Sequence, residues 1–567
     1  MILGTGASPG IAMGKVLILQ NEEFIIKDNI INDVEAEKFR FFKALEDSKN
    51  ELLQIKDKAL IEFGEEKAAI FEAHLMVLED PELISSTVDK IEGEKFSADY
   101  CFKVVTTDFI ELFEGMDNEY MRERVTDIRD VSQRVLGHML GIKSVDLSIL
   151  KESVLLVSND LTPSETANMD KEKVLGFLTN IGGRTSHTAI MARSLEIPAV
   201  VGLGNITTVV KQGDYVIIDG DRGKVLINPD AENITFYNKL KEECEKTKHS
   251  LQSFKEKASV TSDGKKVELA GNIGTPGDIT GLISNGAEGV GLFRTEFIYM
   301  NKDCLPTEEE QFDSYKTVLE SLSPKPVVIR TLDAGGDKKL SYLNIDKEMN
   351  PFLGYRAIRI CLKETDLFKT QLRALLRASV YGNLKIMFPM ISSLEELLLA
   401  KNILNEVKAE MDTDKIAYDS KVEVGMMIEV PSAAIISDIL AKHVDFLSIG
   451  TNDLIQYTCA VDRMNERIHH LYSPFNPAVL RLIKMVIDNG HKEGIWVGMC
   501  GEMAGDKKII PILLGMGLDE FSMSPISILP ARKLIHSLSY ENMKKFTDVI
   551  LKMTTSEDIE RYIEKVF

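Results

Sequence analysis

A histidine follows a glycine pair in the stretch 182–187, which reads GGRTSH, and a helical pattern begins at that histidine. The apolar run 174–178 before it is typical of a strand. Thr185 and Ser186 are residue types that cap helix N-termini. We therefore expect His187 where a helix begins, near unpaired backbone N–H groups and the positive end of the helix dipole. Because such a position favours an anion, the imidazole of His187 is a candidate acceptor of a phosphoryl group.

The C-terminal half carries a second set of polar residues, and each of them ends an apolar run. Eight such runs follow one another, namely VELAGNI, GVGLFRTEF, VVIRTLD, LKIMFPM, VGMMIEV, VDFLSIGTND, IWVGMC and DEFSMS. The polar residues are Arg294 and Glu296 after the second run, Arg330 and Asp333 after the third, Glu429 after the fifth, Asn452 and Asp453 after the sixth, and Cys500 after the seventh.

Helical connections separate the eight runs, of which 394–411 is the clearest. Eight strands alternating with helices predict a (β/α)8 barrel, whose active site forms at the C-terminal ends of the strands. A doubly wound open sheet is the structural alternative. Burying so many charged groups costs several kcal/mol each unless they pair or bind a ligand. A structural ion pair remains an alternative for any one residue, whereas the set predicts a site for a polyanion and a metal ion.

The types of these residues suit phosphoryl transfer. Glu429 and Asp453 offer hard oxygen ligands for Mg2+. An arginine guanidinium can donate two hydrogen bonds to phosphate oxygens, and its positive charge offsets the negative charge of the phosphate. The candidates are Arg294, Arg330 and Arg463, with Arg356 and Lys338 as further cations on loops that follow strands.

The N-terminal half divides by composition. Short strands and helices in 1–32 and 143–229 predict a small α/β domain, and long helical periods in 33–142 predict a helical bundle inserted into it. We expect residues 230–260 to form a polar helical linker and 261–567 to form the barrel. The fold class is therefore multidomain α/β.

Charge and composition restrict the partners. A formal net charge of −21 makes nucleic acid a poor partner, because phosphate backbones attract basic surfaces. No apolar run of about 18 residues predicts a membrane span, and the N-terminus does not resemble a signal peptide. The 6 cysteines lack CxxC spacing, so neither disulfides nor a zinc site is indicated, and a cytoplasmic location is the simplest expectation.

Several motifs together carry a family resemblance. GGRTSHTAIMAR resembles the phosphohistidine motif of the phosphoenolpyruvate-utilising enzymes. VGLFRTEF, RTLDAGGDK, NPFLGYRAIR, GMMIEVPSA, SIGTNDLIQY and GMCGEMAG follow in the order found in Enzyme I of the sugar phosphotransferase system. The resemblance covers essentially the full chain. It implies a phosphotransferase that passes the phosphoryl group of phosphoenolpyruvate to His187 and then to the histidine-containing phosphocarrier protein HPr, releasing pyruvate.

The resemblance also implies individual roles. Arg294 and Arg330 bind phosphate, and Asn452, Asp453 and Arg463 contact phosphoenolpyruvate. Glu429 and Asp453 hold Mg2+, Cys500 donates a proton to the enolpyruvate carbon, and Thr166 contacts the histidine. A small buried hydrophobe is the alternative for Cys500, and an ordinary helix residue is the alternative for Thr166.

The partners implied are a second copy of the chain, bound through the barrel to form a homodimer, and HPr, bound on the helical insertion. Candidate HPr contacts are Glu65, Glu66, His74, Asp80 and Glu82. A solvated acidic face is the alternative reading of these residues.

Two other functions share part of this pattern. A pyruvate phosphate dikinase or phosphoenolpyruvate synthase shares the histidine motif and barrel but needs a nucleotide-binding domain, and no glycine-rich phosphate loop precedes His187. A non-catalytic phosphoryl-sensing or scaffold protein would not need the complete set of arginines, carboxylates and cysteine.

Overall fold

The structure, a computed structural model, describes the chain except residues 20–23, 25, 64, 116–118, 143–146, 148–149, 162–164, 166–168, 171, 184–185, 196, 301–303, 337–339, 341, 343–347, 464 and 466. The side chains of 58–63, 65–70, 119–124, 126, 187, 190, 194, 247–249 and 469 are also left undescribed. The chain forms two compact units, Met1–Thr247 and Lys248–Phe567.

An eight-stranded mixed sheet lies in the first unit, in the order β1-β8-β7-β3-β4-β5-β6-β2. Its strands are β1 (Ile2–Leu3), β2 (Thr5–Ser8), β3 (Ile11–Ile18), β4 (Val154–Ser158), β5 (Val174–Thr179), β6 (Ala199–Val201), β7 (Tyr215–Asp219) and β8 (Lys224–Ile227). β3 to β6 are parallel to one another. The helices α7 (His187–Ser194) and α8 (Ile206–Val209) connect strands of this sheet.

Five helices interrupt this sheet between two of its neighbouring strands. They are α1 (Val34–Phe63), α2 (Glu65–Leu78), α3 (Pro81–Glu94), α4 (Ala98–Glu114) and α5 (Glu119–Leu140). The chain leaves the sheet after β3 and returns in β4, its parallel partner. The five helices enclose a core of their own, which includes Phe41, Phe71, Phe102 and Val135. An inserted helical bundle, as the composition predicted, is therefore present.

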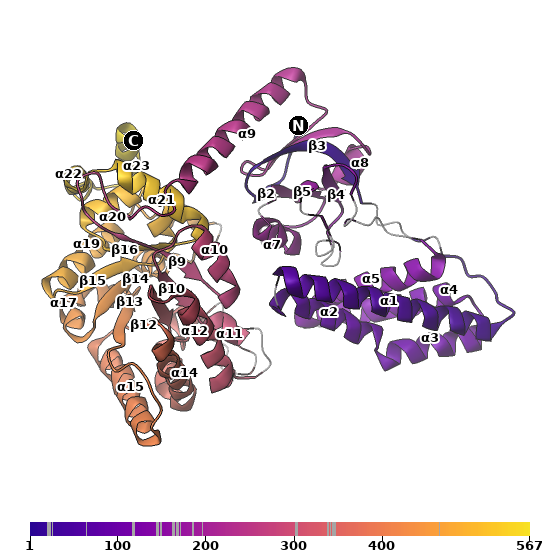
Figure 1. Ribbon diagram of the computed structural model, residues 1–567, viewed down its shortest axis with the longest axis horizontal. Coiled ribbons are helices and arrows are strands. Elements are labelled where there is room, and N and C mark those ends of the chain that lie inside the picture. The colour runs from indigo at the N-terminus through magenta and orange to yellow at the C-terminus, as the bar shows by residue number, and fades with distance from the viewer. Residues whose placement is uncertain are drawn as a thin grey trace. The chain divides into compact units, whose positions relative to one another are not determined.

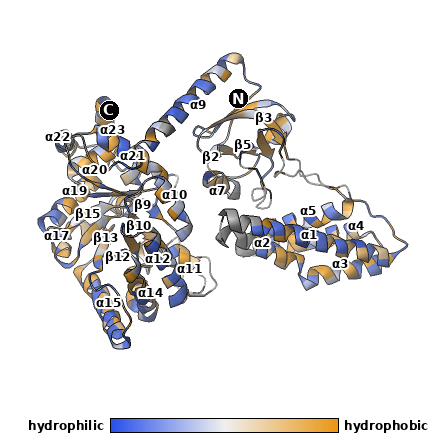
Figure 2. Ribbon diagram, viewed as in Figure 1, coloured by the Kyte–Doolittle hydropathy of each residue, from blue (hydrophilic) through white to orange (hydrophobic). Residues whose placement is uncertain are grey.

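A long helix, α9 (Ala231–Gln252), follows the sheet. Figure 2 shows it as largely hydrophilic along its length. Its many Lys and Glu residues explain this, because such a helix has little apolar surface to bury.

The second unit contains a closed barrel of eight strands, all of them parallel. The strands are β9 (Glu268–Ile273), β10 (Val290–Arg294), β11 (Pro326–Arg330), β12 (Asn383–Phe388), β13 (Glu423–Ile428), β14 (Phe446–Ile449), β15 (Trp496–Met499) and β16 (Glu520–Met523). Each coincides with one of the eight predicted apolar runs, although β11, β12 and β13 begin one residue before their runs. The barrel is confirmed, and the open-sheet alternative is wrong because β16 closes the ring on β9.

Helices surround the strands (Figure 1). They are α10 (Ile279–Ser284), α11 (Glu296–Met300), α12 (Glu308–Leu322), α13 (Ile358–Lys363), α14 (Thr365–Ala378), α15 (Leu394–Asp414), α16 (Pro431–Ile435), α17 (Ser437–Leu440), α18 (Thr451–Cys459), α19 (Pro477–Lys492), α20 (Ile510–Met516), α21 (Pro525–Ser537), α22 (Tyr540–Ile550) and α23 (Ser556–Val566).

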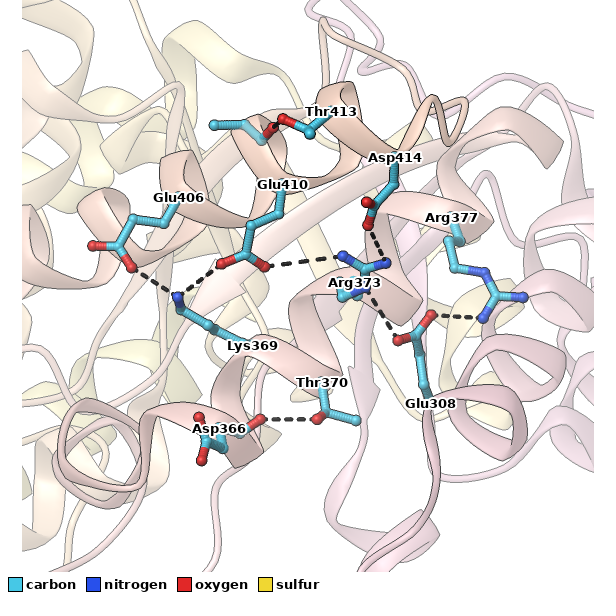
Figure 3. Close-up of polar contacts among 11 residues, drawn as sticks. Glu308, Asp366, Lys369, Thr370, Arg373, Arg377, Glu406, Glu410, Thr413 and Asp414 are labelled. Carbon is cyan, nitrogen blue, oxygen red and sulfur yellow. Dashed lines mark hydrogen bonds and ion pairs between the residues drawn. The ribbon is translucent and has the colours of Figure 1, made fainter.

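Ion pairs link three of the outer helices (Figure 3). Arg373 of α14 lies 3.3 Å from Glu308 of α12 and 3.1 Å from Asp414 of α15. Lys369, one turn earlier on α14, lies 3.0 Å from Glu410 of α15. These contacts join α14 to both α12 and α15 in the outer layer.

The barrel interior is packed with side chains. Leu292, Met387, Met427 and Phe446 form a buried cluster inside the ring, together with Cys500. A closed, filled interior gives the strand ends fixed positions, so that side chains at the C-terminal mouth are held by a rigid support.

Candidate active site

His187 is the first residue of α7. Ser186 caps this helix, and its hydroxyl accepts a hydrogen bond from the backbone N–H of Ala189. Gly182 has φ of 110°, and a Cβ there would lie 3.0 Å from the Ser186 hydroxyl oxygen, so the turn requires glycine. The predicted helix-start position is confirmed for the backbone, whereas the side chain of His187 and the whole of Thr185 lie outside the described residues.

The first turn of α7 is attached to the loop that follows β4. Thr188 is fully buried, and its hydroxyl donates to the Asp160 carboxylate at 2.8 Å. This bond fixes the residue next to His187, and therefore the backbone that presents the imidazole.

The C-terminal mouth of the barrel holds a row of buried charges that alternate in sign, here called the charge row. Its members, in spatial order, are Glu296, Arg330, Asp333, Arg356 and Asp453. The successive N–O distances are 2.7, 3.1, 2.9 and 3.3 Å. They connect the ends of β10 and β11 to the start of α18.

Both arginines of the charge row are held firmly in the charged form. Burial opposes the charge of Arg330, but the carboxylates of Glu296 and Asp333 outweigh it and raise its pKa above the usual value. Burial opposes the charge of Arg356 as well, and the carboxylates of Asp333 and Asp453 likewise raise its pKa. The mouth therefore presents two permanent cations.

Glu429 follows β13 directly and is 2% exposed. One of its carboxylate oxygens accepts the backbone N–H of Met390 at 2.6 Å. Burial raises the pKa of Glu429 above its usual value, and the nearby carboxylates of Asp453 and Asp333 act in the same direction.

Burial and repulsion between carboxylates are what a bound divalent cation relieves, so Glu429 and Asp453 fit Mg2+ as oxygen ligands. Among the residues that the structure describes, no three or more His, Cys, Asp or Glu side chains gather as a metal cage. A Mg2+ ion held by two carboxylates would usually take water and substrate oxygens as its remaining ligands.

Cys500 follows β15 and is buried on the inner side of the barrel. Its backbone carbonyl accepts from the side-chain amide of Asn272 at 3.0 Å, which fixes the turn. Burial raises the pKa of the Cys500 thiol to about 12. The thiol therefore keeps its proton at neutral pH, as a proton donor must.

Three further predicted residues lie around the mouth with greater exposure. Arg294 ends β10, and its guanidinium lies over the ring of Phe297 at 5.3 Å. Asn452 is half-buried in the first turn of α18. Arg463 is half-buried beyond that helix, with its backbone N–H bonded to the Gln456 side chain at 3.1 Å.

Besides the side chain of His187, four predicted site residues fall wholly or in part outside what the structure describes. Lys338 and Thr166 are undescribed altogether, and nothing is described of the side chains of Glu65 and Glu66 in α2.

Among the candidate docking residues, His74 needs correction. Its side chain is 0% exposed, and its ring nitrogens face Asp127 at 3.2 Å and Asp130 at 3.4 Å. A buried imidazole between two carboxylates of α5 cannot contact a partner unless the bundle opens. Asp80 caps α3 by accepting from the N–H groups of Glu82 and Leu83, and Glu82 itself is exposed.

Sequence reasoning missed Tyr457. Its hydroxyl accepts from Arg356 at 3.1 Å and donates to the carbonyl of Phe352 at 2.6 Å. It lies four residues after Asp453 on α18, so both face Arg356. That spacing was visible in the sequence, but the position of Arg356 opposite it was not.

Three family models match the chain. Residues 3–124 match the N-terminal part of PEP-utilising enzymes, 150–223 the mobile domain, and 248–540 the PEP-binding domain. A phosphoenolpyruvate-protein phosphotransferase of Bacillus subtilis (strain 168) is 55% identical over 564 residues, covering 100% of this chain and 99% of that protein. A phosphoenolpyruvate-protein phosphotransferase of Priestia megaterium is also 55% identical, with the same coverage.

The chain belongs to the Enzyme I group of PEP-utilising enzymes. Enzyme I is a phosphoenolpyruvate-protein phosphotransferase of the sugar phosphotransferase system, so this chain is an enzyme of that activity. Among solved structures, a solution structure of an Enzyme I protein is 51% identical, with a TM-score of 0.39, over 43% of this chain and 100% of that one. Within the described residues of this Enzyme I, no helix combines the length and apolar character that crossing a membrane requires.

Proposed function

We propose that this Enzyme I transfers the phosphoryl group of phosphoenolpyruvate to its own His187 and then to HPr, releasing pyruvate. The observation that carries the proposal is the charge row beside Glu429 and Cys500, which places cations, carboxylates and a protonated thiol at one barrel mouth. The cations can bind the phosphate and carboxylate groups of the substrate, and the carboxylates can bind a metal ion. The thiol can donate a proton to the enolate product.

The barrel residues have distinct tasks in this reaction. Arg294, Arg330 and Arg463 bind phosphate oxygens, and Asn452 helps to fix phosphoenolpyruvate. Glu429 and Asp453 hold Mg2+, which supplies charge that offsets the charge developing on the transferred group and the leaving oxygen. Arg356 and Lys338 support this cation set.

Two bonds change in the first half-reaction. The neutral imidazole of His187 attacks phosphorus through Nε2, so a phosphorus–nitrogen bond forms as the bond from phosphorus to the enol oxygen breaks. Cys500 then gives its thiol proton to the methylene carbon, which yields pyruvate. Thr166 is proposed to contact the imidazole and orient it.

Isotopic labelling tests the assignment of His187. Wild-type protein incubated with 32P-phosphoenolpyruvate and Mg2+ should acquire label that is acid-labile and alkali-stable, and His187→Ala should acquire none. His443→Ala, a half-buried histidine of the barrel, is the matched control and should label normally. Acid-labile, alkali-stable label on His187→Ala would show that another histidine accepts the phosphoryl group.

The second half-reaction needs a docking surface for HPr. We propose that HPr docks on the helical insertion, residues 33–142. In the same domain division, residues 1–32 and 143–229 form the α/β domain, 230–260 form the linker and 261–567 form the barrel. Glu82→Lys tests it, because Glu82 is exposed and substitution there spares the Asp80 cap. We expect Glu82→Lys to transfer the phosphoryl group to HPr more slowly than wild type, with unchanged labelling from phosphoenolpyruvate. A wild-type rate of transfer would show that Glu82 does not contact HPr.

Two further properties belong to the same proposal. The barrel mediates a homodimer. Sedimentation of the full chain measures the mass of the particle in solution, which should be that of two chains. The protein works in the cytoplasm, where its 6 cysteines stay reduced.

A further inference from the structure

The centre of the charge row is a carboxylate to which the reaction described above gives no task. Asp333 is 2% exposed, and each of its two oxygens meets a different arginine. Oδ2 lies 3.1 Å from Arg330, and Oδ1 lies 2.9 Å from Arg356. Arg330 is the proposed phosphate ligand, and Arg356 reaches Asp453, the proposed metal ligand, at 3.3 Å.

We propose that Asp333 is a positioning residue for phosphoryl transfer, which fixes the guanidinium groups of Arg330 and Arg356 relative to each other. The distance between the proposed phosphate ligand, Arg330, and the proposed metal ligand, Asp453, is thereby kept fixed. This inference rests on the proposed roles of Arg330 and Asp453. Asp333 itself need not touch the substrate.

The backbone around Asp333 is built for this bridge. Gly335 has φ of 101°, and a Cβ there would lie only 2.5 Å from the Cβ of Arg356. Glycine alone therefore lets the Arg356 segment approach the loop that carries Asp333. The backbone N–H of Ala357 donates to the carbonyl of Ala334 at 2.8 Å and fixes that approach.

A buried glutamine holds the other side of the loop. Gln371 of α14 accepts the backbone N–H of Leu332 at 2.9 Å and donates to the hydroxyl of Thr295 at 3.2 Å. Thr295 in turn donates to the carbonyl of Arg330 at 2.8 Å. The residues on both sides of Asp333 are thus fixed by buried hydrogen bonds, so the bridging carboxylate has little freedom to move.

Charge and geometry can be separated by two substitutions. Asp333→Asn keeps the shape but removes the charge and offers an amide N–H to one of the two arginines. Asp333→Glu keeps the charge, so the buried arginines stay compensated, but its longer side chain moves them apart. If the role were only to neutralise charge for stability, Asp333→Glu would leave catalysis intact.

Steady-state pyruvate formation is the measurement, with phosphoenolpyruvate as the varied substrate and excess HPr as the phosphoryl acceptor. We expect kcat/KM to fall by about 10²-fold in both variants, which is the cost of roughly 1 Å of misplacement. Thermal unfolding of Asp333→Glu shows whether the variant is folded at the assay temperature, because an added methylene in a buried site costs about 1–3 kcal/mol. Asp519→Asn is the matched control, because it removes an ion-paired carboxylate from the opposite end of the same barrel, and its kcat/KM should not change.

A double-mutant cycle shows whether Asp333 acts through Arg330. We expect Asp333→Asn to add little to the loss already caused by Arg330→Gln, because the residue that it positions is then gone. Fully additive losses would overturn the inference, and so would wild-type kcat/KM in a folded Asp333→Glu protein. If Arg330→Gln itself left kcat/KM unchanged, the proposed phosphate site would be wrong instead, so the two failures are distinguishable.

Discussion

Glu268 and Glu520 are register partners on the neighbouring parallel strands β9 and β16, at the N-terminal end of the barrel. Both line a cavity of about 10 Å³, together with Lys385 and Trp496. Lys385 pairs with Glu423 at 2.7 Å, and neither oxygen of Glu520 has a hydrogen-bond partner among the described residues. Burial raises the pKa of Glu268 to about 7 and that of Glu520 well above its usual value.

These shifts predict that the protein loses stability as pH rises. A glutamate in the unfolded chain titrates near 4.3, whereas in the folded barrel Glu268 holds its proton to about pH 7 and burial raises the pKa of Glu520 well above its usual value. The folded state therefore binds more protons above pH ~4.5, so the free energy of unfolding falls with increasing pH. Each retained proton contributes a slope of about 1.4 kcal/mol per pH unit.

Glu520→Gln should remove part of this slope, because an amide does not ionise. Urea unfolding at a series of pH values from about 5 to 9, which begins above the usual pKa of a glutamate, should show the variant gaining stability relative to wild type as pH rises. Glu320 is an exposed glutamate of α12, and the free energy of unfolding of Glu320→Gln should vary with pH as it does in wild type. Parallel curves for Glu520→Gln as well would mean that Glu520 is ionised in the folded protein.

Glu429→Gln should raise the Mg2+ concentration needed for half-maximal pyruvate formation and lower the maximal rate. The reason is that Glu429 and Asp453 are the two protein ligands that we propose for the ion. Mg2+ titrations of initial rate measure both effects. Glu423→Gln at the opposite end of the barrel should keep the wild-type midpoint, and an unchanged midpoint in Glu429→Gln would refute the ligand role.

Cys500→Ala should lower the rate of pyruvate formation by about 10² to 10⁴-fold, the usual contribution of a general acid. Because the thiol pKa is about 12, the wild-type profile of kcat/KM should show no cysteine ionisation from about pH 6 to 9. Cys361→Ala, a fully buried cysteine of α13, is the control for loss of a thiol from the barrel. Similar rates in both alanine variants would assign Cys500 to packing.

Arg373→Met should lower the free energy of unfolding by about 1 kcal/mol, because partly exposed ion pairs contribute little individually. Arg373 joins α14 to both α12 and α15, and its side chain is 22% exposed. Denaturant unfolding at low and at high salt measures the loss, which should shrink in high salt as the charges are screened. A loss that is equal at both salt concentrations would point to lost packing of the arginine stem.

The sequence by itself determined the elements and the chemistry of the ligands. Alternation of eight apolar runs with helices was enough for the barrel, because a parallel strand buried on both faces needs a continuous apolar run. Glu429, Arg330 and Cys500 were found because polar residues that end such runs must share one mouth of the barrel. Ser186 identified the start of α7, because helix capping depends on residues close in sequence.

Only the tertiary structure decided which side chains meet. The contact of Asp333 with Arg356, and of Tyr457 with Phe352, depends on where loops from different strands return, and no local pattern records that. His74 was a candidate contact for HPr from the family resemblance, yet α2 and α5 pack so as to bury it between two aspartates. Periodicity sets which residues a helix or strand turns inward, whereas the partner that each one meets depends on how distant segments pack.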